Sequence, residues 1–179
     1  MVKNNQKRPE GAFTLIELLV VISIISLLSS VVLSSLGGAR EDARQSAAMA
    51  ELDSLRTGIE LMLNDTGKWP NGCPTGQISN PEVNLNNAQA GLLEVPAAAD
   101  QGGGCIWTSD DVAEWNGPYV NSNDLLDGWD RPYRFDPDFY PYRNCSTKAD
   151  EPGIVAIFSY GPAEVIDGYG CNTVFLNLY

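Results

Sequence analysis

The stretch Gly11-Ala-Phe-Thr-Leu-Ile-Glu-Leu-Leu-Val-Val-Ile-Ser-Ile-Ile25 opens the apolar segment that decides the fold of this 179-residue chain. From Phe13 to Leu36 the only charged side chain is Glu17. A helix over these residues would be about 36 Å long, which is enough to cross a hydrocarbon core of ~30 Å with some tilt. A carboxylate in hydrocarbon costs roughly 2.5–3.5 kcal/mol, so Glu17 calls for a functional explanation.

A short basic leader, residues 1–12, precedes this segment. Its small residues, Gly11 and Ala12, come before the apolar core, whereas in a secretory signal the small cleavage-site residues come after it. Cleavage at this point would remove only the leader and make the apolar helix the new N-terminus. The positive charge of the leader predicts that it stays in the cytoplasm while the rest of the chain crosses the membrane.

This arrangement resembles the N-terminal signal of type IV pilins and pseudopilins. The resemblance implies that a prepilin peptidase cuts beside the glycine and methylates the new terminal residue. The family glutamate is the fifth mature residue, so Glu17 implies that Phe13 is the first and that the cut follows Ala12. The inserted Ala12 departs from the commonest pattern and leaves a cut after Gly11 open. The matching residues are Lys7, Arg8, Gly11 and Phe13-Thr-Leu-Ile-Glu-Leu-Leu-Val-Val21.

The resemblance implies a structural subunit of a type IV pilus-like filament, stored in the membrane and polymerised through its N-terminal helix. In a stack of staggered helices, Glu17 of one subunit would pair with the amine of Phe13 in the next. Alternatively, Glu17 lies near enough to the helix start to reach the headgroups. Other expected partners are copies of the chain, an inner-membrane platform and its ATPase. The finished filament would lie at the cell surface or in the periplasm.

Two other functions stay open. One is the major pseudopilin of a type II secretion system, because residues 64–70, 115–120, 127–133 and 158–162 resemble segments of that branch. The other is a membrane-anchored extracellular binding module, which would use the helix only as an anchor. A cleavable leader followed by Glu17 distinguishes an assembling subunit from a plain anchor, which needs neither.

The helix is expected to continue beyond the membrane, since no proline occurs between Leu15 and Lys68. An apolar stripe of helical spacing, followed by Gly67 as a C-terminal cap, predicts a helix that packs on a core. Gly37-Gly38 marks the expected boundary, so the predicted parts are a leader (1–12), a membrane and assembly helix (13–36) and a helix continuation with a globular head (37–179). The stripe comprises Leu52, Leu55, Ile59, Met62 and Leu63.

The rest of the head reads as an irregular region followed by strands. Residues 71–130 are rich in turn formers and predict a long loop with a helical turn at Asn86–Leu93. Pro132–Phe135, Ile154–Tyr160 and Thr173–Tyr179 are predicted to be strands. We therefore expect an α+β fold, in which the long helix packs on a small antiparallel sheet as in type IV pilins.

Four cysteines and no Cys-x-x-Cys spacing favour disulfides over a zinc site in an exported chain. Three pairings are open, and so is a set of four free thiols. Proximity along the chain favours pairing of Cys73 with Cys105 and of Cys145 with Cys171.

The resemblance to major pseudopilins also raises the question of calcium in the loop that follows Ser159-Tyr-Gly161. Calcium prefers six to eight oxygen ligands, and this loop offers few carboxylates, chiefly Glu164 and Asp167. We therefore expect no cofactor, with calcium as the alternative.

Composition argues against two other classes of function. A net charge of −12 argues against sequence-independent binding of nucleic acid, because such binding needs a basic surface. The chain has no histidine, the commonest general base. A group of acidic residues resembles a solvated turn more than an acid/base pair, so no enzymatic activity is expected. This group comprises Asp127, Asp130, Asp136 and Asp138.

Overall fold

The computed structural model describes residues 13–77, 81–121, 125–140, 153–162 and 173–178. The chain divides into two compact units, residues 1–42 and 43–179, which are described separately below. The predicted boundary between the membrane helix and the rest lies at residues 36 and 37.

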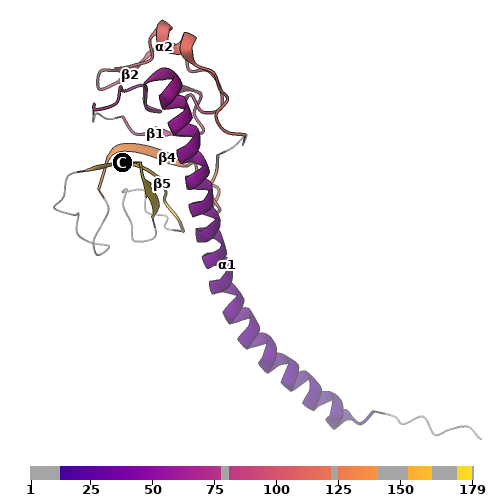
Figure 1. The fold of residues 1–179 in the computed structure, drawn as a ribbon. Coiled ribbons are helices and arrows are strands. Elements are labelled where there is room, and N and C mark those ends of the chain that lie inside the picture. The colour runs from indigo at the N-terminus through magenta and orange to yellow at the C-terminus, as the bar shows by residue number, and fades with distance from the viewer. Residues whose placement is uncertain (1–12, 78–80, 122–124, 141–152, 163–172, 179) are drawn as a thin grey trace, which may run out of the picture. The chain divides into compact units, whose positions relative to one another are not determined.

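The first unit contains the N-terminal part of helix α1, whose full extent is Leu15–Thr66 (Figure 1). The helix continues without a break through Gly37 and Gly38. A Cβ added at either glycine would meet nothing within 4 Å, so neither position is a glycine for lack of space.

The second unit begins with the remainder of α1. Leu52, Leu55, Ile59 and Met62 are all buried, which confirms the predicted stripe. The helix ends at Thr66, and Gly67 follows with φ 69°, its N–H donating a 2.8 Å hydrogen bond to the Leu63 carbonyl. This left-handed cap is the C-terminal stop that the sequence predicts.

A four-stranded antiparallel sheet forms the rest of the core. Its strands are β1 (Val83–Asn84), β4 (Arg134–Phe139), β5 (Ile154–Ser159) and β6 (Val174–Asn177), in the order β1-β4-β5-β6. The pairs Phe135–Ile157 and Ile157–Leu176 set the register across the centre. The long helix packed on a small antiparallel sheet confirms the α+β, pilin-like fold.

Alternate strand residues point to the two faces of the sheet. Phe135, Ile157 and Val174 join the cluster built on the α1 stripe. Phe139 and Phe158 lie on the opposite face, with ring centroids 5.1 Å apart. The sheet is therefore apolar on both faces at its centre, which explains why β5 reads as a continuous apolar run.

The predicted strand Pro132–Phe135 is displaced. Strand β4 starts two residues later and continues through Pro137 to Phe139. The β4–β5 register shifts between Asp136 and Phe139, and this irregularity accommodates a proline that cannot donate to the ladder.

The predicted loop over residues 71–130 contains more structure than expected. It holds β1, the 3₁₀ turn η1 (Ala88–Ala90), the hairpin β2 (Asp100–Gly102) and β3 (Cys105–Ile106), and helix α2 (Ser109–Glu114). The turn η1 confirms the predicted helical turn. Figure 1 shows β2 and α2 beyond the C-terminal end of α1.

Candidate functional site

The candidate site is the start of α1, whose apolar side chains are uncovered. Phe13 is 85% exposed, Ile16 70% and Leu33 69%. By length and composition, the helix is long and apolar enough to cross a membrane. Exposure of so many large apolar side chains costs free energy in water, so this segment needs lipid or protein around it.

Three serines in this segment have their hydroxyls satisfied by the helix itself. Ser26 donates to the Ile22 carbonyl at 2.7 Å. Ser23 and Ser30 donate to carbonyls three residues earlier, at 2.7 and 2.8 Å. These three serines therefore present no unpaired hydroxyl donor to an apolar environment.

Glu17 is the third residue of the helix, and it forms a capping box with Thr14. The carboxylate atom Oε2 accepts hydrogen bonds from the Thr14 N–H at 2.9 Å and from the Thr14 hydroxyl at 2.7 Å. In return, the Glu17 N–H donates to Thr14 Oγ1 at 3.3 Å. The spacing Thr-x-x-Glu before an apolar run is the sequence signature of this motif, although the motif was not among the features predicted from the sequence.

The capping box fixes where α1 starts. Thr14 is the N-cap residue, so Phe13 lies outside the helix, on the N-terminal side of its first turn. The Glu17 carboxylate is held at the positive end of the helix dipole, where a negative charge is favourable. Pairing of Glu17 with a neighbouring Phe13 stays a prediction. Gly11 and Ala12, the other predicted cleavage residues, lie outside the described residues.

Two members of the acidic group in the head, Asp127 and Asp136, are not solvated, whereas Asp130 is exposed. Asp127 is 4% exposed and Asp136 is fully buried, so that interpretation is wrong for both. Asp127 Oδ1 accepts from the Trp129 N–H at 2.9 Å and the Arg131 N–H at 3.0 Å, and Oδ2 accepts from the Ser159 hydroxyl. Asp127 therefore ties the turn before β4 to the end of β5, which is a structural role.

Two tyrosines tether α1 to the rest of the head. Tyr133, at the start of the sheet, donates its hydroxyl to Glu51. Tyr119 donates to Asp65 Oδ2 at 2.9 Å, near the C-terminal end of the helix. Burial raises the pKa of both tyrosines, and the hydrogen bond to a carboxylate raises each pKa further.

A disulfide joins Cys73 to Cys105, the pairing that proximity along the chain favours. Cys145 and Cys171 lie outside the described residues. Glu164 and Asp167 do too, so the expectation of no cofactor and its alternative, calcium in that loop, both stay untested predictions. Within the part of the chain that the structure describes, no group of three or more His, Cys, Asp or Glu side chains could hold a metal ion.

Comparison with known proteins agrees with the N-terminal motif and the fold. The family model described as the prokaryotic N-terminal methylation motif matches residues 7–33. Type II secretion system core protein G of Pectobacterium carotovorum subsp. carotovorum is 34% identical over 135 residues, covering 60% of this chain and 85% of that protein. No solved structure matches significantly.

Two further relatives match over shorter stretches. The core protein G of Aeromonas hydrophila is 35% identical over 65 residues, and that of Dickeya chrysanthemi is 31% identical over 64. Each match covers 36% of this chain, and the chain spans less than half the length of either relative, 46% and 42%.

The methylation motif, the exposed apolar helix and the α+β head together define a pilin-like protein. The Pectobacterium match extends this likeness across most of a relative's length. The chain belongs to the family of the type II secretion system core protein G.

Proposed function

We propose that this chain is the subunit of a pilus-like secretion filament, held in the membrane before assembly and polymerised through α1. The observation that carries the proposal is the uncovered apolar surface over residues 13–36, which bears a single carboxylate near its start. In the membrane, lipid would cover this surface, and in a filament the helices of neighbouring subunits would cover it. The names of the relatives favour secretion over a cell-surface pilus.

Processing by a prepilin peptidase would expose the new N-terminus. A cut between Ala12 and Phe13, with methylation of Phe13, agrees with the methylation motif over residues 7–33. Because Thr14 is the N-cap, Phe13 lies outside the helix, so its amine would be free to reach a neighbour. An inner-membrane platform with its ATPase would complete the machinery.

Glu17 would have two roles in this scheme. In the free subunit its carboxylate caps its own helix through Thr14. In the filament it would also neutralise the amine of the next Phe13 and so fix the axial register. Two charges in a low-dielectric environment attract far more strongly than in water, and either one left alone would be costly.

The substitution Glu17→Gln separates these two roles. Glutamine retains an acceptor for the capping box but carries no charge. We expect the variant to insert into the membrane at wild-type levels and to form no filaments, as judged by electron microscopy of sheared cells. Wild-type filaments from this variant would refute the pairing.

Thr14→Ala is the matched control, because it removes the hydroxyl half of the capping box and leaves the carboxylate in place. Loss of an N-cap costs about 1 kcal/mol of helix stability. We expect filaments from this variant in reduced number. If Thr14→Ala abolished filaments as completely as Glu17→Gln, the helix cap rather than the charge would explain the defect.

A membrane-anchored binding module would need neither the leader nor the charge. The N-terminal mass of the purified protein distinguishes the two functions. We expect a chain that begins with methylated Phe13, whereas an intact Met1 would favour the anchor.

A further inference from the structure

The docked segment, residues 99–116, has little backbone pairing with the rest of the head. Its strands β2 and β3 form a separate two-stranded sheet, and among the described residues neither strand joins the four-stranded sheet. Helix α2 completes the segment, with none of its residues fully buried. Side chains and a covalent bond must therefore attach this segment to the head.

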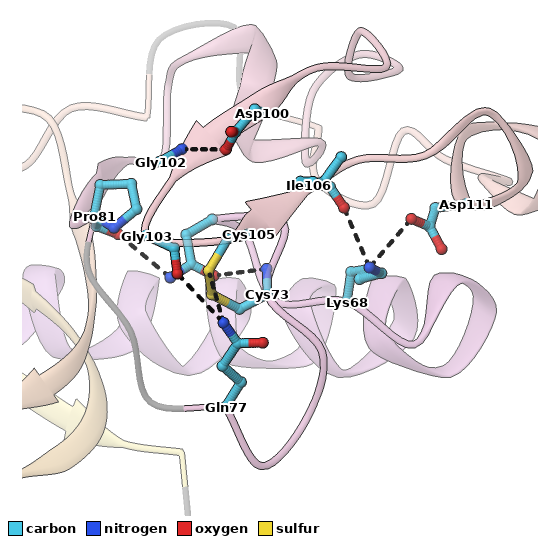
Figure 2. Close-up of a disulfide and its surroundings, with 11 residues drawn as sticks. Lys68, Cys73, Gln77, Pro81, Asp100, Gly102, Gly103, Cys105, Ile106 and Asp111 are labelled. Atoms are coloured by element: carbon cyan, nitrogen blue, oxygen red, sulfur yellow. Dashed lines mark hydrogen bonds and ion pairs between the residues drawn. A yellow bond between two sulfur atoms is a disulfide. The ribbon is translucent and has the colours of Figure 1, made fainter.

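The attachment is made at the turn that follows α1 (Figure 2). The disulfide joins Cys73 in this turn to Cys105 in β3. Lys68 lies beside it, and its Nζ donates to the Ile106 carbonyl and pairs with Asp111 Oδ2, both at 3.2 Å. One strand end and one helix start are thus fastened to the same short turn.

The sulfur atoms of the disulfide are covered by the protein at this contact. Cys73 and Cys105 are both fully buried, and Trp107 is 1% exposed. The Trp107 ring lies against Gly72, where an added Cβ would be 3.2 Å from Cδ1. Its Nε1 donates to the Gln89 carbonyl at 2.9 Å. No disulfide reagent can reach the sulfurs while this packing is in place.

We infer that oxidation of Cys73 and Cys105 is coupled to docking of residues 99–116, so a thiol–disulfide oxidant is a maturation partner of this chain. One thiolate attacks the disulfide of the oxidant and forms a mixed disulfide. The second thiolate then displaces the oxidant, which leaves as a dithiol with the two electrons, and the cysteines lose two protons. Such oxidants act outside the cytoplasm, and the inference does not depend on filament formation.

The first test measures protection of the finished disulfide. The full chain in detergent micelles is treated with dithiothreitol, alkylated and digested with trypsin, which releases Cys73 and Cys105 on one peptide, residues 69–134. We expect this peptide to gain two labels about 100-fold more slowly in buffer than in urea. In buffer, residues 99–116 must move away from the head before dithiothreitol can attack the disulfide. A difference of less than tenfold would overturn the coupling.

The second test asks whether the docked segment forms without the bond. The reduced chain is refolded from urea with or without oxidised glutathione, and hydrogen exchange is followed by mass spectrometry. A bond that closes a loop of 32 residues favours the closed state by on the order of several hundred-fold. Docking is reported by the Trp107 indole, whose Nε1–H donates to the Gln89 carbonyl outside the segment at 2.9 Å, so tryptophan fluorescence is recorded on the same samples.

We expect residues 99–116 to gain protection only with the oxidant, while β4 and β5 gain it in both samples. Equal protection of residues 99–116 in both samples would overturn the inference, and so would loss of β4 and β5 from the reduced sample. Neither test involves filaments, so failure here leaves the proposed function to be judged by the filaments of the Glu17→Gln and Thr14→Ala variants and by the N-terminal mass.

Discussion

Gly58 is the position where a single methyl group should be most informative. It is a buried glycine near the C-terminal end of α1, and a Cβ added there would lie 2.7 Å from Val120 Cγ1 and 3.1 Å from the Tyr119 carbonyl oxygen. Real Cβ atoms essentially never approach a neighbour as closely as 2.7 Å, so either the helix or the segment at Tyr119 and Val120 must move. A β-branched valine and a backbone carbonyl have little freedom to do so.

The expected cost of Gly58→Ala follows from two opposing effects. Alanine stabilises a helix interior by about 1 kcal/mol relative to glycine. Overpacking a tight contact costs about 1–3 kcal/mol, and contact with a backbone atom places this site toward the upper end. The free energy of unfolding of the head should therefore fall by about 1–2 kcal/mol, which for a domain of this size lowers Tm by roughly 4–8 °C.

Urea unfolding of the detergent-solubilised chain, followed by tryptophan fluorescence, measures this effect, because all four tryptophans lie in residues 43–179. Gly38→Ala is the control, since a Cβ there meets nothing within 4 Å, and it should leave the stability of the head unchanged. Adding Val120→Ala to Gly58→Ala should recover about 1 kcal/mol relative to the sum of the single effects. A Gly58→Ala protein as stable as the wild type would refute the close packing.

Two further predictions concern pH. The raised pKa of Tyr133 gives stability that is complete below the ordinary tyrosine pKa of 10.0 and is lost as the pH rises above it. Tyr133→Phe should lose about 1 kcal/mol at neutral pH and decline less than the wild type between pH 10 and 12 in urea titrations. Burial acts to raise the pKa of Asp111, but hydrogen bonds from Thr108 and the charge of Lys68 outweigh it and lower that pKa below 3.8. Its contribution is complete above about pH 4 and is lost below it, so Asp111→Asn should show a shallower acid-induced fall in Tm; an unchanged slope would contradict this assignment.

The helix and the central strands could be predicted because their signals are local. The stripe from Leu52 to Met62 has helical spacing, and β5 is a continuous apolar run. The end of β4 could not be located, since Pro137 is typical of a strand break and only the β4–β5 irregularity accommodates it. The hairpin of β2 and β3 was missed because it is very short and rich in glycine and depends on contacts distant in sequence.

The functional residues also divide into those with a local sequence signal, which could be predicted, and those that depend on contacts distant in sequence, which could not. Glu17 could be identified because a charged residue within an apolar run is recognisable from the sequence alone. Its hydrogen bonds with Thr14 were also readable, from the Thr-x-x-Glu spacing, but were overlooked. Burial of Asp127 could not be foreseen, since its partner Ser159 is 32 residues away and comes close only when β4 and β5 pair.

The two tyrosine tethers have a mechanical consequence. Glu51 and Asp65 are separated by 14 positions, or about 21 Å of helix. Hydrogen bonds depend on direction as well as distance, so two of them at distant points along the helix oppose both sliding and rotation, in addition to the close apolar packing. With only one of these hydrogen bonds the helix could rotate about that contact, whereas two of them restrain its orientation. An axial load on this part of α1 would therefore reach the head at two points, through Tyr133 beside β4 and through Tyr119, so the helix and the head would move together.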